Sequence, residues 1–111
     1  MINRSAVIVR PSQPYIDWAS NLDDSGIVPD PDGEPSIYLL PEYDTDDEGW
    51  ALLSKGFDVI FDAELDGWHT DSTAWPAKRT FAMFRRWFQI TMCSCIDDLC
   101  EGPIIDDEDE F

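Results

Sequence analysis

Glu64 and His69 are the two side chains whose types and spacing come closest to an acid–base pair. His69 is the only histidine of the chain, and it follows Glu64 by five residues. If this region is helical, Glu64 projects at the same angle as Leu53 and Ile60, in the middle of an apolar stripe. A carboxyl group in such a place can be tuned into a general acid or base. A small enzyme using Glu64 and His69 is therefore one hypothesis for this sequence.

A structural role for Glu64 is the alternative. An unpaired carboxylate is costly to bury, so we expect Glu64 to be paired, to be protonated or to lie at the solvent edge of the stripe. Its expected partners in a buried ion pair are Arg79, Arg85 and Arg86. A hydrolase or a zinc site needs a second histidine or a nucleophile at a defined spacing, and no such motif is present. The sequence favours a protein without catalytic residues.

Neither the cysteines nor the acidic turn at residues 30–33 predicts a metal site. On a regular helix Cys93 and Cys95 point about 200° apart. Cys93 and Cys100 share a side of that helix but lie ~10.5 Å apart along its axis. The turn fails the EF-hand register, because the first and last ligand positions hold apolar residues. We therefore expect no cofactor and no metal.

Charge is the strongest signal in the chain. There are 24 acidic against 7 basic side chains, for a net charge of −17. Such a charge repels nucleic acid and anionic membranes, so no direct binding to either is expected. The expected partner is a basic protein. Its predicted binding surface, the acidic face, comprises Asp44, Asp46, Asp47, Glu48, Asp58, Asp62 and Asp66.

The leading functional hypothesis is a non-catalytic interaction module that binds a basic partner through the acidic face. A second hypothesis is a DNA mimic that inhibits a DNA-binding protein. Carboxylates four residues apart on a helix lie ~6 Å apart, comparable to the step between phosphates along one DNA strand. The acidic residues have a simpler interpretation as well, since they keep a small aromatic-rich protein in solution.

The first elements that must position these side chains are two strands and a helix. Residues 6–9 form a continuous apolar, largely β-branched run, typical of a buried strand, and residues 36–40 form a second apolar run. Between them, Tyr15, Trp18 and Ala19 follow helical spacing. Strand, helix and strand in succession predict a right-handed, parallel βαβ unit.

Two further helices are expected. One starts in the acidic residues 44–48 and ends at Gly67, and a long one runs from about Thr80 to Cys100. A strand over residues 80–88 is an alternative, because that stretch is rich in aromatic residues. A second apolar surface lies opposite the core stripe of the long helix. Either this surface is packed inside the domain, or a partner or a second copy of the chain covers it. This surface consists of Met83, Trp87 and Ile90.

Together these elements predict one α/β or α+β domain, a small sheet with a βαβ unit covered by about three helices. We place this single acidic domain at residues 1–105 and an acidic tail at residues 106–111. Three cysteines are an odd number and form no disulfide framework. No signal peptide or membrane span is recognisable, so a cytoplasmic protein is expected.

Several short stretches carry a resemblance to a known group of proteins. They are Ala6-Val7-Ile8-Val9-Arg10-Pro11, Pro14-Tyr15-Ile16-Asp17-Trp18, Leu65-Asp66-Gly67-Trp68, Trp75-Pro76 and Phe84-Arg85-Arg86-Trp87-Phe88. In these stretches, which span most of the chain, the sequence resembles a group of small acidic proteobacterial proteins of unknown function. The resemblance implies a bacterial, cytoplasmic origin. It assigns no catalytic residue.

Overall fold

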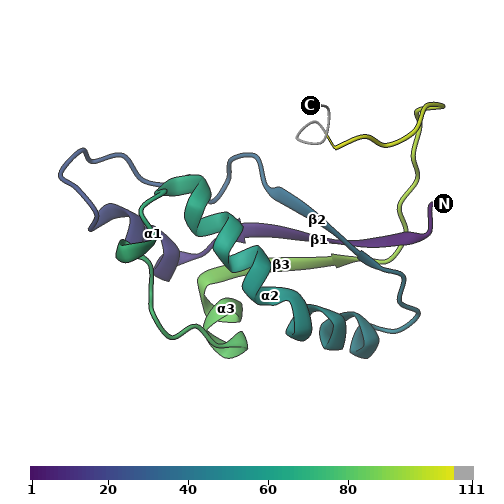
Figure 1. Ribbon diagram of the computed structural model, residues 1–111, viewed down its shortest axis with the longest axis horizontal. Coiled ribbons are helices and arrows are strands. Elements are labelled where there is room, and N and C mark those ends of the chain that lie inside the picture. Colours follow the sequence, from purple (N-terminus) through teal and green to yellow (C-terminus); the bar gives the residue numbers. More distant parts are fainter. Residues whose placement is uncertain (107–111) are drawn as a thin grey trace.

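In the described part of the chain the protein is α+β, with three helices and a three-stranded antiparallel sheet of order β2-β1-β3 (Figure 1). The computed structural model describes residues 1–106. Its elements are β1 (Arg4–Pro11), α1 (Gln13–Ser20), β2 (Ser36–Pro41), α2 (Asp46–Trp68), the 3-10 turn η1 (Ser72–Ala74), α3 (Phe81–Trp87) and β3 (Phe88–Cys93). The predicted acidic tail lies, apart from Asp106, outside the described residues.

The predicted parallel βαβ unit is wrong, because β1 and β2 run antiparallel. Val9 near the end of β1 lies opposite Ser36 at the start of β2, and Val7 lies opposite Tyr38. A parallel crossover must carry the chain back along the whole of β1, which is eight residues or about 26 Å long. Helix α1 has eight residues and rises only about 12 Å. The chain therefore re-enters the sheet at the end where β1 left it.

The predicted long helix from Thr80 to Cys100 is also wrong, because it stops after two turns. Thr80 caps α3, and its hydroxyl oxygen accepts a hydrogen bond from the backbone N–H of Met83 at 3.1 Å. From Phe88 onward the chain forms β3, which pairs antiparallel with the second edge of β1. Phe84 and Phe88 fit one helix face, yet the alternation of Phe88 and Ile90 fits a strand equally well. Pairing with β1 decides between the two.

The core lies on the face of the sheet that α2 crosses diagonally (Figure 1). Alternate residues of the strands point into it, and Val7 and Val9 of β1 are 0% and 1% exposed. The buried residues of this core are Val7, Val9, Tyr15, Leu40, Leu53, Ile60, Phe61, Leu65, Phe84 and Phe88. Ring contacts between α2 and the α3–β3 segment, such as Phe61 with Phe84, hold the helix layer to the sheet.

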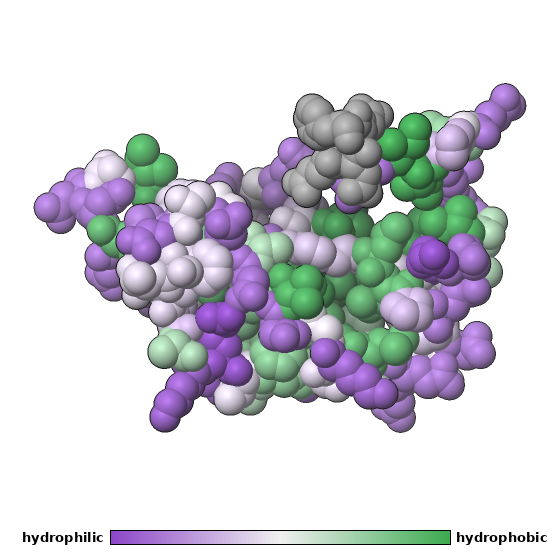
Figure 2. Space-filling model, in the orientation of Figure 1, coloured by the Kyte–Doolittle hydropathy of each residue, from purple (hydrophilic) through white to green (hydrophobic). Residues whose placement is uncertain are grey.

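The opposite face of the sheet carries apolar side chains in contact with water. Ile37 and Leu39 of β2 are 62% and 51% exposed, and they lie opposite Ile8 and Ala6 of β1. These residues line a shallow hollow of about 320 Å³ together with Cys93 and its neighbours. The packed face lies under α2, and Figure 2, which views the molecule from that side, shows hydrophobic residues over the right-hand half with hydrophilic ones around the edge. The sheet therefore has one packed face and one open face.

A pair of glycines in α2 gives a first test of this packing. Gly49 is buried, and a Cβ placed there would lie 3.0 Å from the ring of Tyr43 and from the terminal carbon of Met92. Gly56 has nothing within 4 Å of that position. We expect Gly56→Ala to raise the free energy of unfolding by about 0.5–1 kcal/mol through helix propensity. Gly49→Ala should lower it, because overpacking costs about 1–3 kcal/mol. Urea unfolding of both variants checks this prediction. Equal changes in the free energy of unfolding would contradict it.

Candidate functional site

Glu64 lies on the flank of α2 that faces β2, with its side chain half-buried. One carboxylate oxygen, Oε2, accepts hydrogen bonds from the hydroxyl of Tyr38 at 2.7 Å and from the hydroxyl of Ser36 at 3.0 Å. The backbone carbonyl of Glu64 accepts a third, from the hydroxyl of Tyr15 at 2.6 Å. Three neutral hydroxyls from two other elements therefore hold this residue in place.

The predicted ion pair of Glu64 with Arg79, Arg85 or Arg86 is wrong. Arg79 pairs instead with Asp62 and lies over the ring of Phe61 at 5.4 Å. Arg85 lies over the ring of Trp50 at 4.5 Å, and Arg86 is exposed. These arginines sit on or just before α3, which packs along the other flank of α2, so none of them reaches the side that faces β2.

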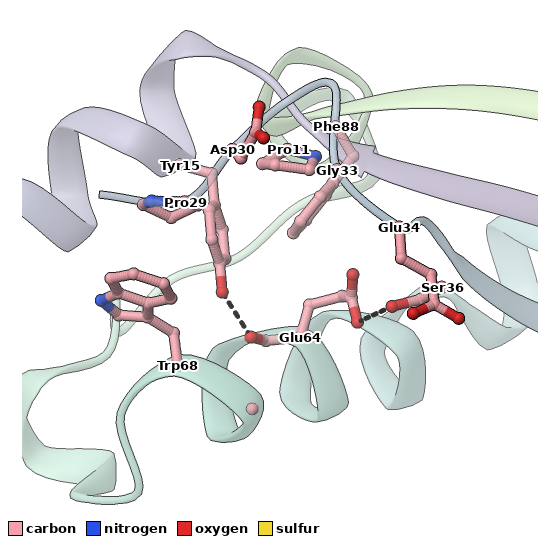
Figure 3. A pocket seen from close by; sticks show the side chains of 11 residues that line it. Pro11, Tyr15, Pro29, Asp30, Gly33, Glu34, Ser36, Glu64, Trp68 and Phe88 are labelled. Atoms are coloured by element: carbon pink, nitrogen blue, oxygen red, sulfur yellow. Dashed lines mark hydrogen bonds between the residues drawn. The ribbon is translucent and has the colours of Figure 1, made fainter. Parts of the chain in front are cut away.

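A hollow of about 400 Å³ opens beside the Glu64 carboxylate (Figure 3). Three aromatic side chains and three carboxylates contribute to its wall, and no lysine, arginine or histidine does. The lining residues are Pro11, Tyr15, Pro29, Asp30, Gly33, Glu34, Ser36, Glu64, Gly67, Trp68 and Phe88. The hollow brings together α1, the loop before β2, the C-terminal turns of α2 and the start of β3.

The tyrosines around Glu64 stay protonated at neutral pH. Burial raises the pKa of Tyr15 and of Tyr38 well above the ordinary value of 10, and the adjacent Glu64 carboxylate raises both further. Ionising either phenol would put a second negative charge in a partly dehydrated place. Both hydroxyls therefore remain hydrogen-bond donors to Glu64.

These shifts predict that the protein loses stability in alkali. Below the ordinary phenol pKa of 10 the folded and unfolded chains hold the same phenolic protons. Above it the unfolded chain releases protons that the folded chain retains, so the free energy of unfolding falls as pH rises. The fall should be at most about 1.4 kcal/mol per pH unit for each phenol, and less for Tyr38, which water partly screens. Urea midpoints measured across alkaline pH should fall less steeply in Tyr38→Phe, and equal slopes would refute this.

Glu64 and His69 are not brought into one site. His69 lines a second hollow of about 240 Å³ with Asp23 and Ser25. Trp68 lines both hollows, but Glu64 does not contribute to the one at His69. The two acidic side chains near His69 accept hydrogen bonds from residues close to them in the sequence. Hydrogen bonds from Ser25 lower the pKa of Asp23, and hydrogen bonds from Thr73 lower the pKa of Asp71. The geometry therefore offers no support for an acid–base pair of Glu64 with His69.

The side chains of the predicted acidic face are all exposed. Asp46, Asp47 and Glu48 form the first turn of α2, whose N-cap Thr45 accepts from the backbone N–H of Glu48. Asp44 precedes that turn. Asp58, Asp62 and Asp66 follow at helical spacing on the outward side of α2, and Asp62 alone of the face forms an ion pair among the described residues.

Met83, Trp87 and Ile90 do not form the predicted second surface. Trp87 ends α3, and its ring packs inward with centroids 5.6 Å from Phe61 and 6.2 Å from Trp18. Ile90 belongs to β3 and, with Met83, packs against the core. Because the helix stops at Trp87, the three residues never share a helical face. A homodimer stays a prediction, without this surface to support it.

The partners of Glu64, which are Ser36 and Tyr38, were not predicted from the sequence. They lie 28 and 26 residues before it in the chain. A signal was present, since these two hydroxyl side chains alternate with Ile37 and Leu39 and so share one face of a strand. Tyr15 and Trp68, which line the same hollow, were not among the predicted site residues.

Comparisons with protein-family models, with curated proteins and with solved structures found no match for this chain. Its resemblance to small acidic proteobacterial proteins therefore stays a prediction. Within residues 1–106, no helix has the length and apolar character needed to cross a bilayer. In the same part of the chain, no three metal-ligating side chains come together. The three cysteines, Cys93, Cys95 and Cys100, are free thiols.

Proposed function

We propose that the protein is a non-catalytic, cytoplasmic interaction module that binds a basic protein through the acidic face of α2. The observation that carries this proposal is the charge of that helix. Within 23 residues α2 holds seven acidic side chains and one lysine. On the acidic face, only Asp62 is compensated by an ion pair among the described residues.

An uncompensated surface of this kind is costly to the protein that carries it. Like charges one helical turn apart repel each other, by a few tenths of a kcal/mol per pair. A partner that brings lysines or arginines to Asp58 and Asp66 relieves this repulsion on binding and is steered towards the surface by its field. Acidic side chains in the first turn of α2 also interact with the positive end of the helix dipole.

The ion pair of Asp62 with Arg79 weighs against the DNA-mimic alternative. A phosphate-like array needs an unbroken row of negative charges, and Asp62 is the middle member of the row from Asp58 to Asp66. Arg79 places a guanidinium group directly on that middle carboxylate. The row therefore presents two separated charges rather than three.

Paired variants with the same net charge test the proposal. Asp58→Asn/Asp66→Asn removes two charges from the acidic face and leaves the ion pair of Asp62 intact. Asp17→Asn/Asp24→Asn removes two exposed charges elsewhere. Immobilised wild-type protein should capture a basic protein from bacterial lysate, the first variant should lose it and the second should retain it. Capture that is equal for both variants, or absent with the wild type, would reject the acidic face.

The captured complex is expected to be strongly salt-dependent. Electrostatic screening shortens the Debye length from ~10 Å at 0.1 M salt to ~3 Å at 1 M. A titration of the captured protein across this range should show a steep loss of affinity. Affinity that does not change with salt would contradict an electrostatic interface, and displacement of the partner by duplex DNA would favour the DNA mimic.

A further inference from the structure

Three aromatic rings and the carboxylate of Glu64 line the same 400 Å³ hollow. Tyr15 comes from α1, Trp68 is the last residue of α2 and Phe88 is the first residue of β3. Tyr15 is fixed by its hydrogen bond to the Glu64 carbonyl and by ring contact with Phe88 at 5.3 Å. Figure 3 shows the rings of Tyr15 and Trp68 on the same side of the carboxylate. Faces of aromatic rings attract cations.

One oxygen of the Glu64 carboxylate is left for a ligand. Both hydroxyl donors, Ser36 and Tyr38, bind Oε2. Figure 3 shows the other oxygen pointing away from Ser36 into the hollow. Among residues 1–106 the ion pairs are Arg79 with Asp62 and the N-terminal amine with Asp97, so no cation of this chain neutralises Glu64.

The rim of the hollow adds further negative charge. Asp30 and Glu34, both exposed, line its mouth. The guanidinium of Arg10 donates to the carbonyl of Gly33 at 2.7 Å, and so it holds this loop without lining the hollow. Among residues 1–106, the wall therefore combines aromatic faces with three carboxylates and contains no basic side chain.

We propose that this hollow binds an organic cation, a primary alkylammonium or guanidinium group on a short aliphatic stem. The cation would donate to the second oxygen of Glu64, and the stem would lie against Tyr15 and Trp68. The volume is in the range of small-molecule pockets, which begins at about 300 Å³. Either a free amine or the tip of a lysine or arginine side chain presents this chemistry.

The proposed site is distinct from the acidic face. Glu64 projects about 200° around α2 from Asp62, at 100° per residue. A ligand in the hollow therefore lies on the flank that faces β2, away from Asp58 and Asp66. The proposal holds or fails independently of the interaction function assigned to the acidic face.

Nuclear magnetic resonance titration of the full chain tests the site. The probes are n-butylammonium and n-propylguanidinium, with butan-1-ol and butyrate as neutral and anionic controls. The indole N–H signal of Trp68, assigned with Trp68→Phe, should shift saturably with both cations and with neither control. Glu64→Gln should weaken binding by about tenfold, because a charge-assisted hydrogen bond becomes a neutral one. Glu42→Gln, which removes one exposed charge outside both the hollow and the acidic face, should leave binding within twofold, about 0.4 kcal/mol.

Other outcomes overturn the site. The absence of saturation rejects it, and so does equal weakening by Glu42→Gln, which would show diffuse counterion attraction. If Glu64→Gln fails to fold, Glu34→Gln on the exposed rim is used in its place. This variant should weaken binding measurably, and an unchanged affinity rejects the site. A capped peptide with one lysine among serines and glycines distinguishes the two sources of the cation, a protein side chain and a free amine. Tighter binding of the peptide than of n-butylammonium identifies a protein ligand, and weaker binding identifies a free amine.

Discussion

Replacement of Phe61 by alanine is expected to lower the free energy of unfolding by about 3–5 kcal/mol. Phe61 is fully buried in α2, and its ring centroid lies 5.8 Å from that of Phe84, 5.6 Å from Trp87 and 5.3 Å from Phe88. Truncation removes these contacts and leaves a cavity between α2 and the segment that forms α3 and β3. Domains are stable by only about 5–15 kcal/mol in total. Urea unfolding followed by circular dichroism should therefore show a midpoint far below that of the wild type.

The matched control for this substitution is Val59→Ala on the same helix. Val59 is 70% exposed, so its truncation should change the free energy of unfolding by no more than about 0.5 kcal/mol. Similar effects of the two substitutions would mean that Phe61 does not join α2 to the rest of the core.

Trp87→Glu should destabilise the fold rather than separate two copies of the protein. The Trp87 ring contacts Tyr15 and Trp18 of α1 and Phe61 of α2, at centroid distances of 5.6–6.3 Å. A carboxylate there removes the contacts that join three helices and places a charge against apolar rings. We expect a loss of about 3 kcal/mol or more, comparable to truncation of a buried aromatic side chain. Urea unfolding measures this loss.

The control for Trp87→Glu separates folding from association. Ile37→Glu lies on the open face of the sheet, where Ile37 is 62% exposed, so it should cost less than about 1 kcal/mol. If a homodimer forms through that face, sedimentation velocity should show Ile37→Glu as a folded monomer beside a dimeric wild type. A folded Trp87→Glu with an altered sedimentation coefficient would contradict the internal packing of Trp87.

The first half of the fold was predictable from local signals. The run at residues 6–9 predicted β1, and the spacing of Tyr15, Trp18 and Ala19 predicted α1. The acids at residues 44–48 and the apolar stripe after them predicted α2, whose ends differ from expectation by one or two residues. These signals are local because helix spacing, capping and dipole effects act within a few residues of the chain.

The candidate site was only half visible in the sequence. Glu64 stood out because a carboxylate in an apolar stripe needs a partner. The nearest cations along the chain were the expected partners, yet the actual ones are the hydroxyls of Ser36 and Tyr38. Which flank of α2 meets β2 and which meets α3 depends on how the layers pack. No residue close to Glu64 in the sequence indicates this arrangement.

By itself the sequence determined where β1, α1, β2 and α2 form, and that the chain carries a charge of −17 on a mixed domain. Only the tertiary structure decided the antiparallel direction of β2, the ending of α3 at Trp87 and the strand formed by residues 88–93. The backbone groups on both edges of β1 must find hydrogen-bond partners when the strand is buried. Segments far away in the chain supply those partners, so their conformation follows from β1 rather than from their own residues.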